Sequence, residues 1–132
     1  MLKFWNDYTS QELEELVKGR PLTKESVNYV LQNKIKEISV VDYVNKNAYA
    51  IPSCDGRYSI IIASNLSQEE RSQSLIHEIC HVNYRALGIY MGTPHFGPKR
   101  EEARRIEEIL EKEAQRWYRE NKDFINLIIN DL

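Results

Sequence analysis

The spacing of hydrophobic residues predicts two short helices at the beginning of the chain. Thr9 and Glu12 form a capping-box pattern at the start of the first helix, and Gly19 is placed to end it. Thr23 is a candidate N-cap for the second helix. The apolar residues at helical spacing are Leu13, Leu16 and Val17 in the first helix, and Val27, Val30 and Leu31 in the second. We interpret both helices as packing elements.

A change to β-branched residues at positions 35–44 predicts a switch from helix to strand. Turn-forming residues at 45–47 separate this stretch from a short strand at 48–52. Asp55-Gly56 is a hairpin-turn signal, and it precedes a third strand at 57–63. These patterns predict a small antiparallel sheet of three strands.

Helical patterns return in the second half of the chain. Ser67 and Glu70 form another capping box, which opens a long helix expected over residues 68–87. After a loop rich in glycine and proline, a charged amphipathic helix is expected over residues 99–121, and a short helix follows near the end. The chain 1–132 is therefore expected to fold as one α+β domain, with helices packed around one small sheet.

Composition excludes several classes of protein. The chain has 132 residues, 42% of them hydrophobic, which is enough for a core, and its 18 Lys+Arg against 20 Asp+Glu leave a net charge of −2. Direct nucleic-acid binding is not expected, because phosphate recognition needs concentrated positive charge. No apolar run approaches the roughly 20 residues that span a bilayer, and the N-terminal residues lack the apolar core of a signal peptide. Cys54 and Cys80 are too few for a disulfide scaffold. We expect a cytoplasmic protein without a membrane partner, and its oligomeric state is left open.

Residues 77–81 carry the chemistry, since His77-Glu78-Ile79-Cys80-His81 is the pattern HExxH within a predicted helix. Positions i and i+4 of a helix lie about 40° apart on one face, so His77 and His81 can bind one zinc ion. Glu78 flanks that face and is the expected general base, which takes a proton from water activated by the metal. Much of the rest of the helix is apolar, and burying two histidines and a carboxylate there without a metal would be costly.

A catalytic zinc site needs a third protein ligand and an open position. The chain lacks the glycine and third histidine that a metzincin places after HExxH. Among the glutamates of the next helix, Glu101 points away from the apolar stripe, and Glu107 lies on the far flank, more than a turn later. Glu102 lies in the first turns, about 80° from the centre of the stripe, and can lean inward. Glu102 is therefore the best candidate on this helix.

His95 is a rival to Glu102. It lies in the loop, fourteen residues after His81. It could be the third ligand, it could stabilise the oxyanion of a tetrahedral intermediate, or it could be an ordinary surface histidine.

Residues 59–67, together with the motif at 75–81, resemble the ImmA/IrrE family of metallopeptidases. Members carry a strand, a turn similar to Asn-x-x-Leu-Ser, a helix bearing HExxH, and a later helix with a Glu-Ala pair. Glu102-Ala103 matches that pair loosely. Two positions depart from the pattern, because Cys80 replaces a glycine and Glu107 replaces a small residue.

The resemblance covers about residues 57–110, and it implies a small zincin-like domain of gluzincin type. It implies zinc held by His77, His81 and Glu102, with Glu78 as the base. It also implies a protease of phages, mobile elements or stress responses that cleaves a repressor-type regulator. The substrate is expected to lie extended beside the strand at 58–63, as an added strand.

Two alternatives remain open. Residues 94–97 are similar to a segment of SprT-like proteases, in which His95 would be the third ligand. The small size of the chain and the lack of a separate specificity domain also fit a zinc-binding protein that acts by binding a partner, without proteolysis.

Overall fold

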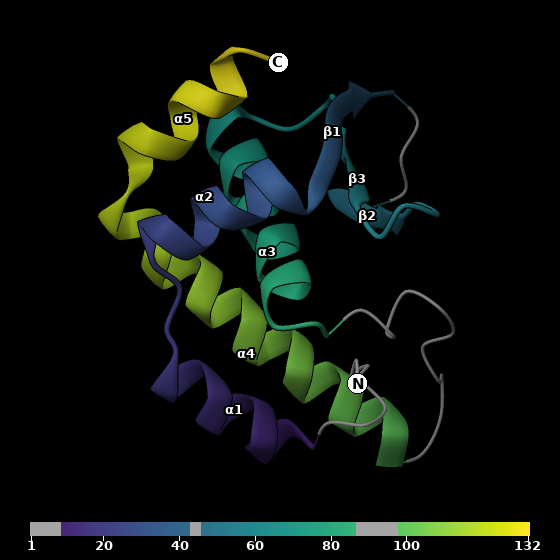
Figure 1. Ribbon diagram of the computed structural model, residues 1–132, viewed down its shortest axis with the longest axis vertical. Helices are drawn as coiled ribbons and strands as arrows, with labels where there is room; N and C mark the ends of the chain where they lie inside the picture. The colour runs from purple at the N-terminus through teal and green to yellow at the C-terminus, as the bar shows by residue number, and fades with distance from the viewer. Residues whose placement is uncertain (1–8, 43–45, 87–97) are drawn as a thin grey trace.

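The computed structural model describes residues 9–42, 46–86 and 98–132. Within them lie five helices and three strands in mixed order along the chain (Figure 1). The elements are α1 (Ser10–Gly19), α2 (Lys24–Asn33), β1 (Ile35–Val41), β2 (Ala48–Pro52), β3 (Tyr58–Ala63), α3 (Gln68–Asn83), α4 (Pro98–Glu120) and α5 (Lys122–Asn130). The α+β prediction is confirmed.

Three helices begin at capping boxes, in which a hydroxyl at the N-cap and a side chain three residues later satisfy each other's backbone N–H groups. Thr9 pairs with Glu12 at α1, and Ser67 pairs with Glu70 at α3, as the sequence predicts. Thr23 does the same with Ser26 at α2. These caps fix where the helices start, and the start of α3 sets the position of HExxH along its axis.

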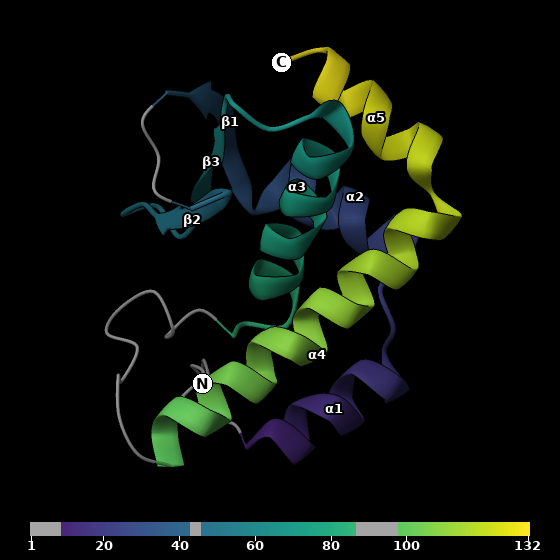
Figure 2. The same cartoon turned by 180° about the vertical axis from the view of Figure 1, so that it is seen from behind.

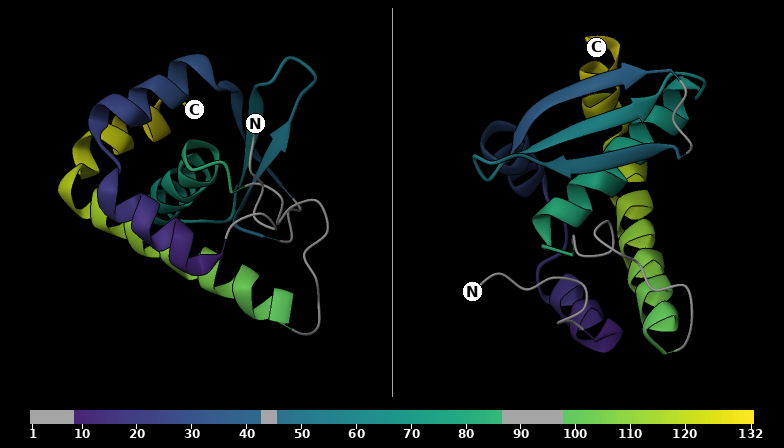
Figure 3. Two further views of the ribbon diagram at one scale, coloured as in Figure 1. Left: turned by 60° about the horizontal axis from the view of Figure 1, so that its bottom comes forward. Right: turned by 90° about the vertical axis from the view of Figure 1, so that its right-hand side faces the viewer.

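The sheet is mixed, so the prediction of an antiparallel sheet is wrong. Its strand order is β1-β3-β2, with β2 antiparallel and β1 parallel to β3 (Figure 3). Successive strands do alternate in direction, and β2 and β3 form the expected hairpin around Gly56, whose φ is 82°. The difference is that β3, with Ile60 and Ile62 fully buried, takes the central place between the other two strands. It therefore meets β1 running the same way.

Helix α3 lies at the centre of the fold, between the sheet and α4 (Figures 1 and 3). It contacts β2, β3, α2, α4 and α5, which explains why apolar residues occupy so much of its circumference. Leu75, Ile76 and Ile79 are fully buried there. Helix α1 packs on α4, on the far side from the sheet (Figure 2). One continuous hydrophobic cluster joins the helices and the sheet.

Helix α3 ends earlier than the predicted residue 87. The last helical residue is Asn83, and Arg85 adopts a left-handed conformation with φ of 58°. The N–H of Ala86 donates to the carbonyl of His81, and the N–H of Arg85 donates to that of Val82. This is a Schellman motif, which stops a helix by turning its last carbonyls onto the following residues.

Helix α4 is the longest element, with 23 residues and charged side chains along its exposed face. No helix among the described residues is both long and apolar enough to cross a lipid bilayer.

Candidate metal centre

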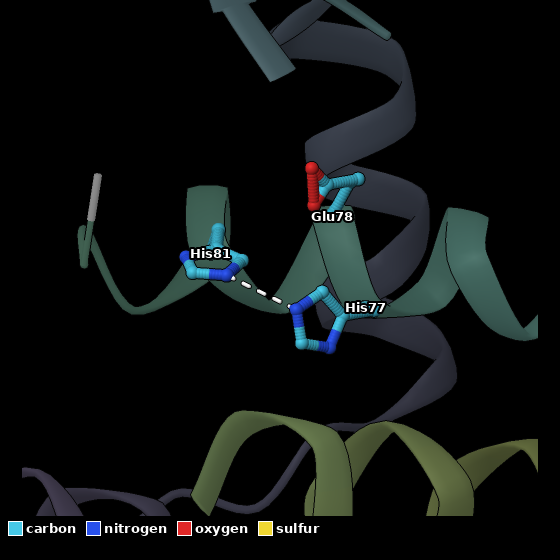
Figure 4. A group of neighbouring side chains, drawn as sticks. All are labelled: His77, Glu78 and His81. Atoms are coloured by element: carbon cyan, nitrogen blue, oxygen red, sulfur yellow. Dashed lines mark hydrogen bonds between the residues drawn. The ribbon is translucent and has the colours of Figure 1, made fainter. Parts of the chain in front are cut away.

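The two histidines of HExxH face each other on α3. Their Nε2 atoms lie 3.2 Å apart, and Figure 4 shows the rings turned toward one another. The side chain of Glu78 is buried on the same helix, and its carboxylate lies within 4.8 Å of ligand atoms of both histidines. The spacing of the motif thus brings together the three side chains that the sequence singles out, His77, Glu78 and His81.

A backbone carbonyl orients His81. This side chain is fully buried, and its Nδ1 lies 2.7 Å from the carbonyl oxygen of Ala86. A carbonyl can only accept, so Nδ1 donates its proton in this hydrogen bond, and Nε2 is the ring nitrogen that faces His77. The Schellman turn that ends α3 therefore also fixes the face of His81 that points toward His77.

Glu107 of α4 contacts both His77 and His81. One oxygen of its carboxylate lies 2.8 Å from Nε2 of His81, and the other lies 2.9 Å from Nε2 of His77. Burial alone would raise the pKa of Glu107, but hydrogen bonds from the two histidines hold it well below its usual range. Glu107 is therefore an anion placed between two imidazoles.

Glu111, one turn further along α4, contacts the opposite side of His77. Its Oε2 lies 2.6 Å from Nδ1, in an approach that fits an ion pair but not the angle of a hydrogen bond. Burial lowers the pKa of His77, yet Glu107 and Glu111 outweigh burial and raise this pKa to about 10. Contact with His77 also lowers the pKa of Glu111.

Glu102, the expected third ligand, contacts α1 and not the histidines. Its carboxylate accepts the backbone N–H of Ser10 at 2.7 Å and the hydroxyl of Ser10 at 3.2 Å, and it also pairs with Arg105. The Ser10 N–H is the largest cause of its lowered pKa. The structure therefore brings Glu107, and not Glu102, to the two histidines. Glu101 pairs with Arg104 at the exposed surface.

Glu107 reaches the histidines and Glu102 does not, because α4 packs against both α1 and α3. The flank that carries Glu102 meets α1, whereas the flank that carries Glu107 and Glu111 meets α3. An apolar stripe read from sequence gives one mean direction for the core, and it does not say which flank meets which neighbour. His95, the other candidate, lies outside the described residues.

The donor set suits a metal ion. Two imidazole nitrogens and a carboxylate form the His₂Glu combination found in catalytic zinc sites. Ligands about 2.0–2.1 Å from a tetrahedral zinc lie roughly 3.3 Å apart, close to the 3.2 Å between the two Nε2 atoms. The residues present therefore fit zinc.

A comparison with protein-family models matches residues 30–115 to the IrrE N-terminal-like domain, Peptidase_M78. The match covers well over half of the chain. The chain belongs to this family. No curated protein and no solved structure matches it significantly.

Membership in the IrrE N-terminal-like family points to a metallopeptidase. The matched region contains the whole sheet, α3 and α4 as far as Gln115, and so includes every residue of the His77 and His81 cluster. It leaves α1 and α5 outside.

Glu107 and Glu111 contact the histidines, and the sequence analysis does not select either of them. A signal for them exists in the spacing, because positions i and i+4 share one helix face, as the histidines of HExxH do. Two i, i+4 pairs on successive helices can face each other when the helices pack side by side. Within residues 98–120, positions 107 and 111 are the only two glutamates four residues apart, so the sequence does carry a signal for this pair.

Proposed function

We propose that this chain is a zinc-dependent endopeptidase in which His77, His81 and Glu107 hold the metal. The observation that carries the proposal is the placement of one Glu107 carboxylate against Nε2 of both histidines, at 2.8 and 2.9 Å. This choice of third ligand replaces the expected Glu102, whose oxygens are committed to Ser10 and Arg105.

Glu78 is the proposed general base. A zinc ion bound at the site would supply a Lewis acid that acidifies water and polarises the scissile carbonyl. The Glu78 carboxylate would take the proton of the attacking water and deliver it to the leaving amine nitrogen. Its side chain is buried, and its carboxylate lies within 4.8 Å of ligand atoms of both histidines, which suits this role.

The edge that can receive a substrate is that of β2. The expected strand, β3, is paired on both sides and has no free edge. Among the described residues β2 has β3 as its single strand neighbour, and it contacts α3. Figures 1 and 3 show β2 at the edge nearer the C-terminal half of α3, where the histidines lie.

The hydrogen-bond pattern shows which groups of β2 point outward. Asn47 and Ser53 bond to β3 or its turn, at Ala63 and Arg57. Bonding alternates along an antiparallel pair, so Ala48, Ala50 and Pro52 turn their backbone groups away from β3. Ala50 is buried, whereas Ala48 is partly exposed and Pro52 is exposed. The outward N–H and carbonyl of Ala48 and the outward carbonyl of Pro52 are therefore the groups that an extended segment of substrate could meet.

The proposed substrate is a protein with an accessible extended segment, and a repressor-type regulator of a phage or mobile element is the class that the ImmA/IrrE resemblance suggests. This rests on the family and on the resemblance alone. Incubating the protein with such a regulator and mapping new termini by mass spectrometry would test it.

The metal assignment is tested by zinc content after purification without chelator. We expect near-stoichiometric zinc in the wild type and in Glu102→Gln, and its loss in Glu107→Gln. Zinc lost in Glu102→Gln but kept in Glu107→Gln would contradict the assignment. Zinc lost only in His95→Ala would favour the SprT-like alternative, and a wild type without zinc would favour a non-proteolytic binding protein.

A further inference from the structure

The side chain of Glu111 contacts His77 at Nδ1, the ring nitrogen that does not face His81. Its Oε2 lies 2.6 Å from Nδ1 of His77, whereas Nε2 of the same ring faces His81 and Glu107. We propose that Glu111 is a positioning residue for the metal site, which holds the His77 ring and keeps its proton on Nδ1. The proposal rests on the proposed zinc site and adds to it a residue that does not touch the metal.

The two histidines are held in different ways. The ring of His81 is fully buried and is hydrogen-bonded to the backbone carbonyl of Ala86. No side-chain substitution removes this carbonyl. Among the described residues, the group that touches Nδ1 of His77 is the Glu111 carboxylate, and the His77 side chain is 17% exposed. The orientation of His77 therefore depends on a side chain, and that of His81 on the end of α3.

Glu111 is itself held in place. Its other oxygen, Oε1, accepts a hydrogen bond of 3.0 Å from Nε2 of Gln115, one turn further along α4. Glu107, Glu111 and Gln115 thus form a ladder at i, i+4 and i+8 on one face of the helix. The amide at the end of the ladder directs Oε2 of Glu111 toward His77.

Such a carboxylate has a defined effect on a metal site. A carboxylate beside the second ring nitrogen of a histidine ligand fixes its tautomer and makes the metal-binding nitrogen more basic, and loss of the carboxylate typically weakens metal binding about 10- to 100-fold. An ordinary surface ion pair would contribute little, since exposed pairs are weak. Glu111 is 46% exposed, so its effect must show in metal affinity rather than in folding.

The test is zinc affinity, measured on the full chain by competition with a chromophoric chelator. The variants are Glu111→Ala and Glu111→Gln, with Glu108→Ala as the matched control on the same helix. Glu108 is exposed and pairs with Arg104, away from the histidines. We expect about a 10- to 100-fold weaker affinity in Glu111→Ala. We expect a smaller loss in Glu111→Gln, which keeps a polar oxygen and the size of the side chain but loses its charge, and no more than about a twofold change in the control.

A second readout reports the orientation of the ring. In the zinc-loaded wild type, ¹⁵N NMR should show the proton of His77 on Nδ1 and protected from solvent exchange, and this protection should be lost in Glu111→Ala. Zinc binding by the wild type with unchanged affinity in Glu111→Ala would overturn the role of Glu111 and leave the proposed function intact. A wild type that binds no zinc would overturn both, and zinc abolished in Glu111→Ala as fully as in Glu107→Gln would make Glu111 a ligand instead.

Discussion

The Nδ1 of His81 lies 2.7 Å from the carbonyl oxygen of Ala86, five residues later in the chain. A straight helix could not make this contact, because the carbonyl of residue i+5 lies further along the axis and points away from the ring. It forms here because α3 ends at Asn83 and Arg85 turns the chain back. The end of the helix and the orientation of the His81 ring are therefore one structural feature.

Replacement of Arg85 by glycine is expected to stabilise the protein. A residue with a side chain costs about 1–2 kcal/mol in the left-handed conformation. Glycine avoids that cost but loses about 0.4–1 kcal/mol through a more flexible unfolded chain. Urea unfolding should show Arg85→Gly more stable than Arg85→Ala by roughly 0.5–1 kcal/mol. Equal stability of the two variants would mean that the turn carries no strain.

Glu113 is expected to matter more for folding than any other charged residue of α4. It is buried, accepts the backbone N–H of Leu22 at 2.6 Å, and pairs with Arg116 at 2.7 Å. Glu113→Ala leaves a buried N–H and a half-buried guanidinium without this partner, which should cost about 2–3 kcal/mol in urea unfolding. Glu113→Gln should recover part of this, since its amide oxygen still accepts.

The control for this prediction is Glu120→Ala. Glu120 is exposed and contacts the same guanidinium of Arg116 at 2.8 Å. Exposed pairs contribute at most about 1 kcal/mol, so the loss should be small. A cost equal to that of Glu113→Ala would show that the charge of Arg116, and not the buried N–H of Leu22, sets the energy.

The sequence predicts best what depends on neighbouring residues. The capping boxes at Thr9 and Ser67 and the turn at Gly56 lie where the pattern places them, because each involves atoms only a few residues apart. HExxH also works within one helix, so its histidines meet as expected. Strand order and the third acidic partner depend on how distant elements pack, and both differ from the prediction.

The end of α3 is a second feature that the sequence does not predict correctly. The left-handed residue of a Schellman motif is usually glycine, and Gly88 lies close to the predicted end. In the structure an arginine takes that conformation three residues earlier. A rule that looks for glycine therefore predicts the end of α3 too late, and it does not predict the contact between Ala86 and His81.

A proline at position 48 should separate substrate binding from folding. The outward N–H of Ala48 does not bond to β3, so Ala48→Pro should preserve the sheet and remove one donor from its free edge. We expect the KM for a peptide substrate to rise several-fold, with near-native unfolding by urea. Tyr49→Pro is the matched control, because its N–H faces Ile61 of β3 and its loss should destabilise the fold. An unchanged KM in Ala48→Pro would argue against strand addition at β2.

Glu78→Gln should separate metal binding from catalysis. The substitution keeps the size of the buried side chain and leaves His77, His81 and Glu107 in place, so zinc content should be unchanged. It removes the carboxylate that accepts the proton, which should lower kcat by about 10²- to 10⁴-fold. Glu69→Gln, an exposed change in the first turn of the same helix, should leave the rate unaffected. Zinc retained together with a native rate in Glu78→Gln would assign the base to another residue, and loss of zinc would make Glu78 part of the metal-holding set.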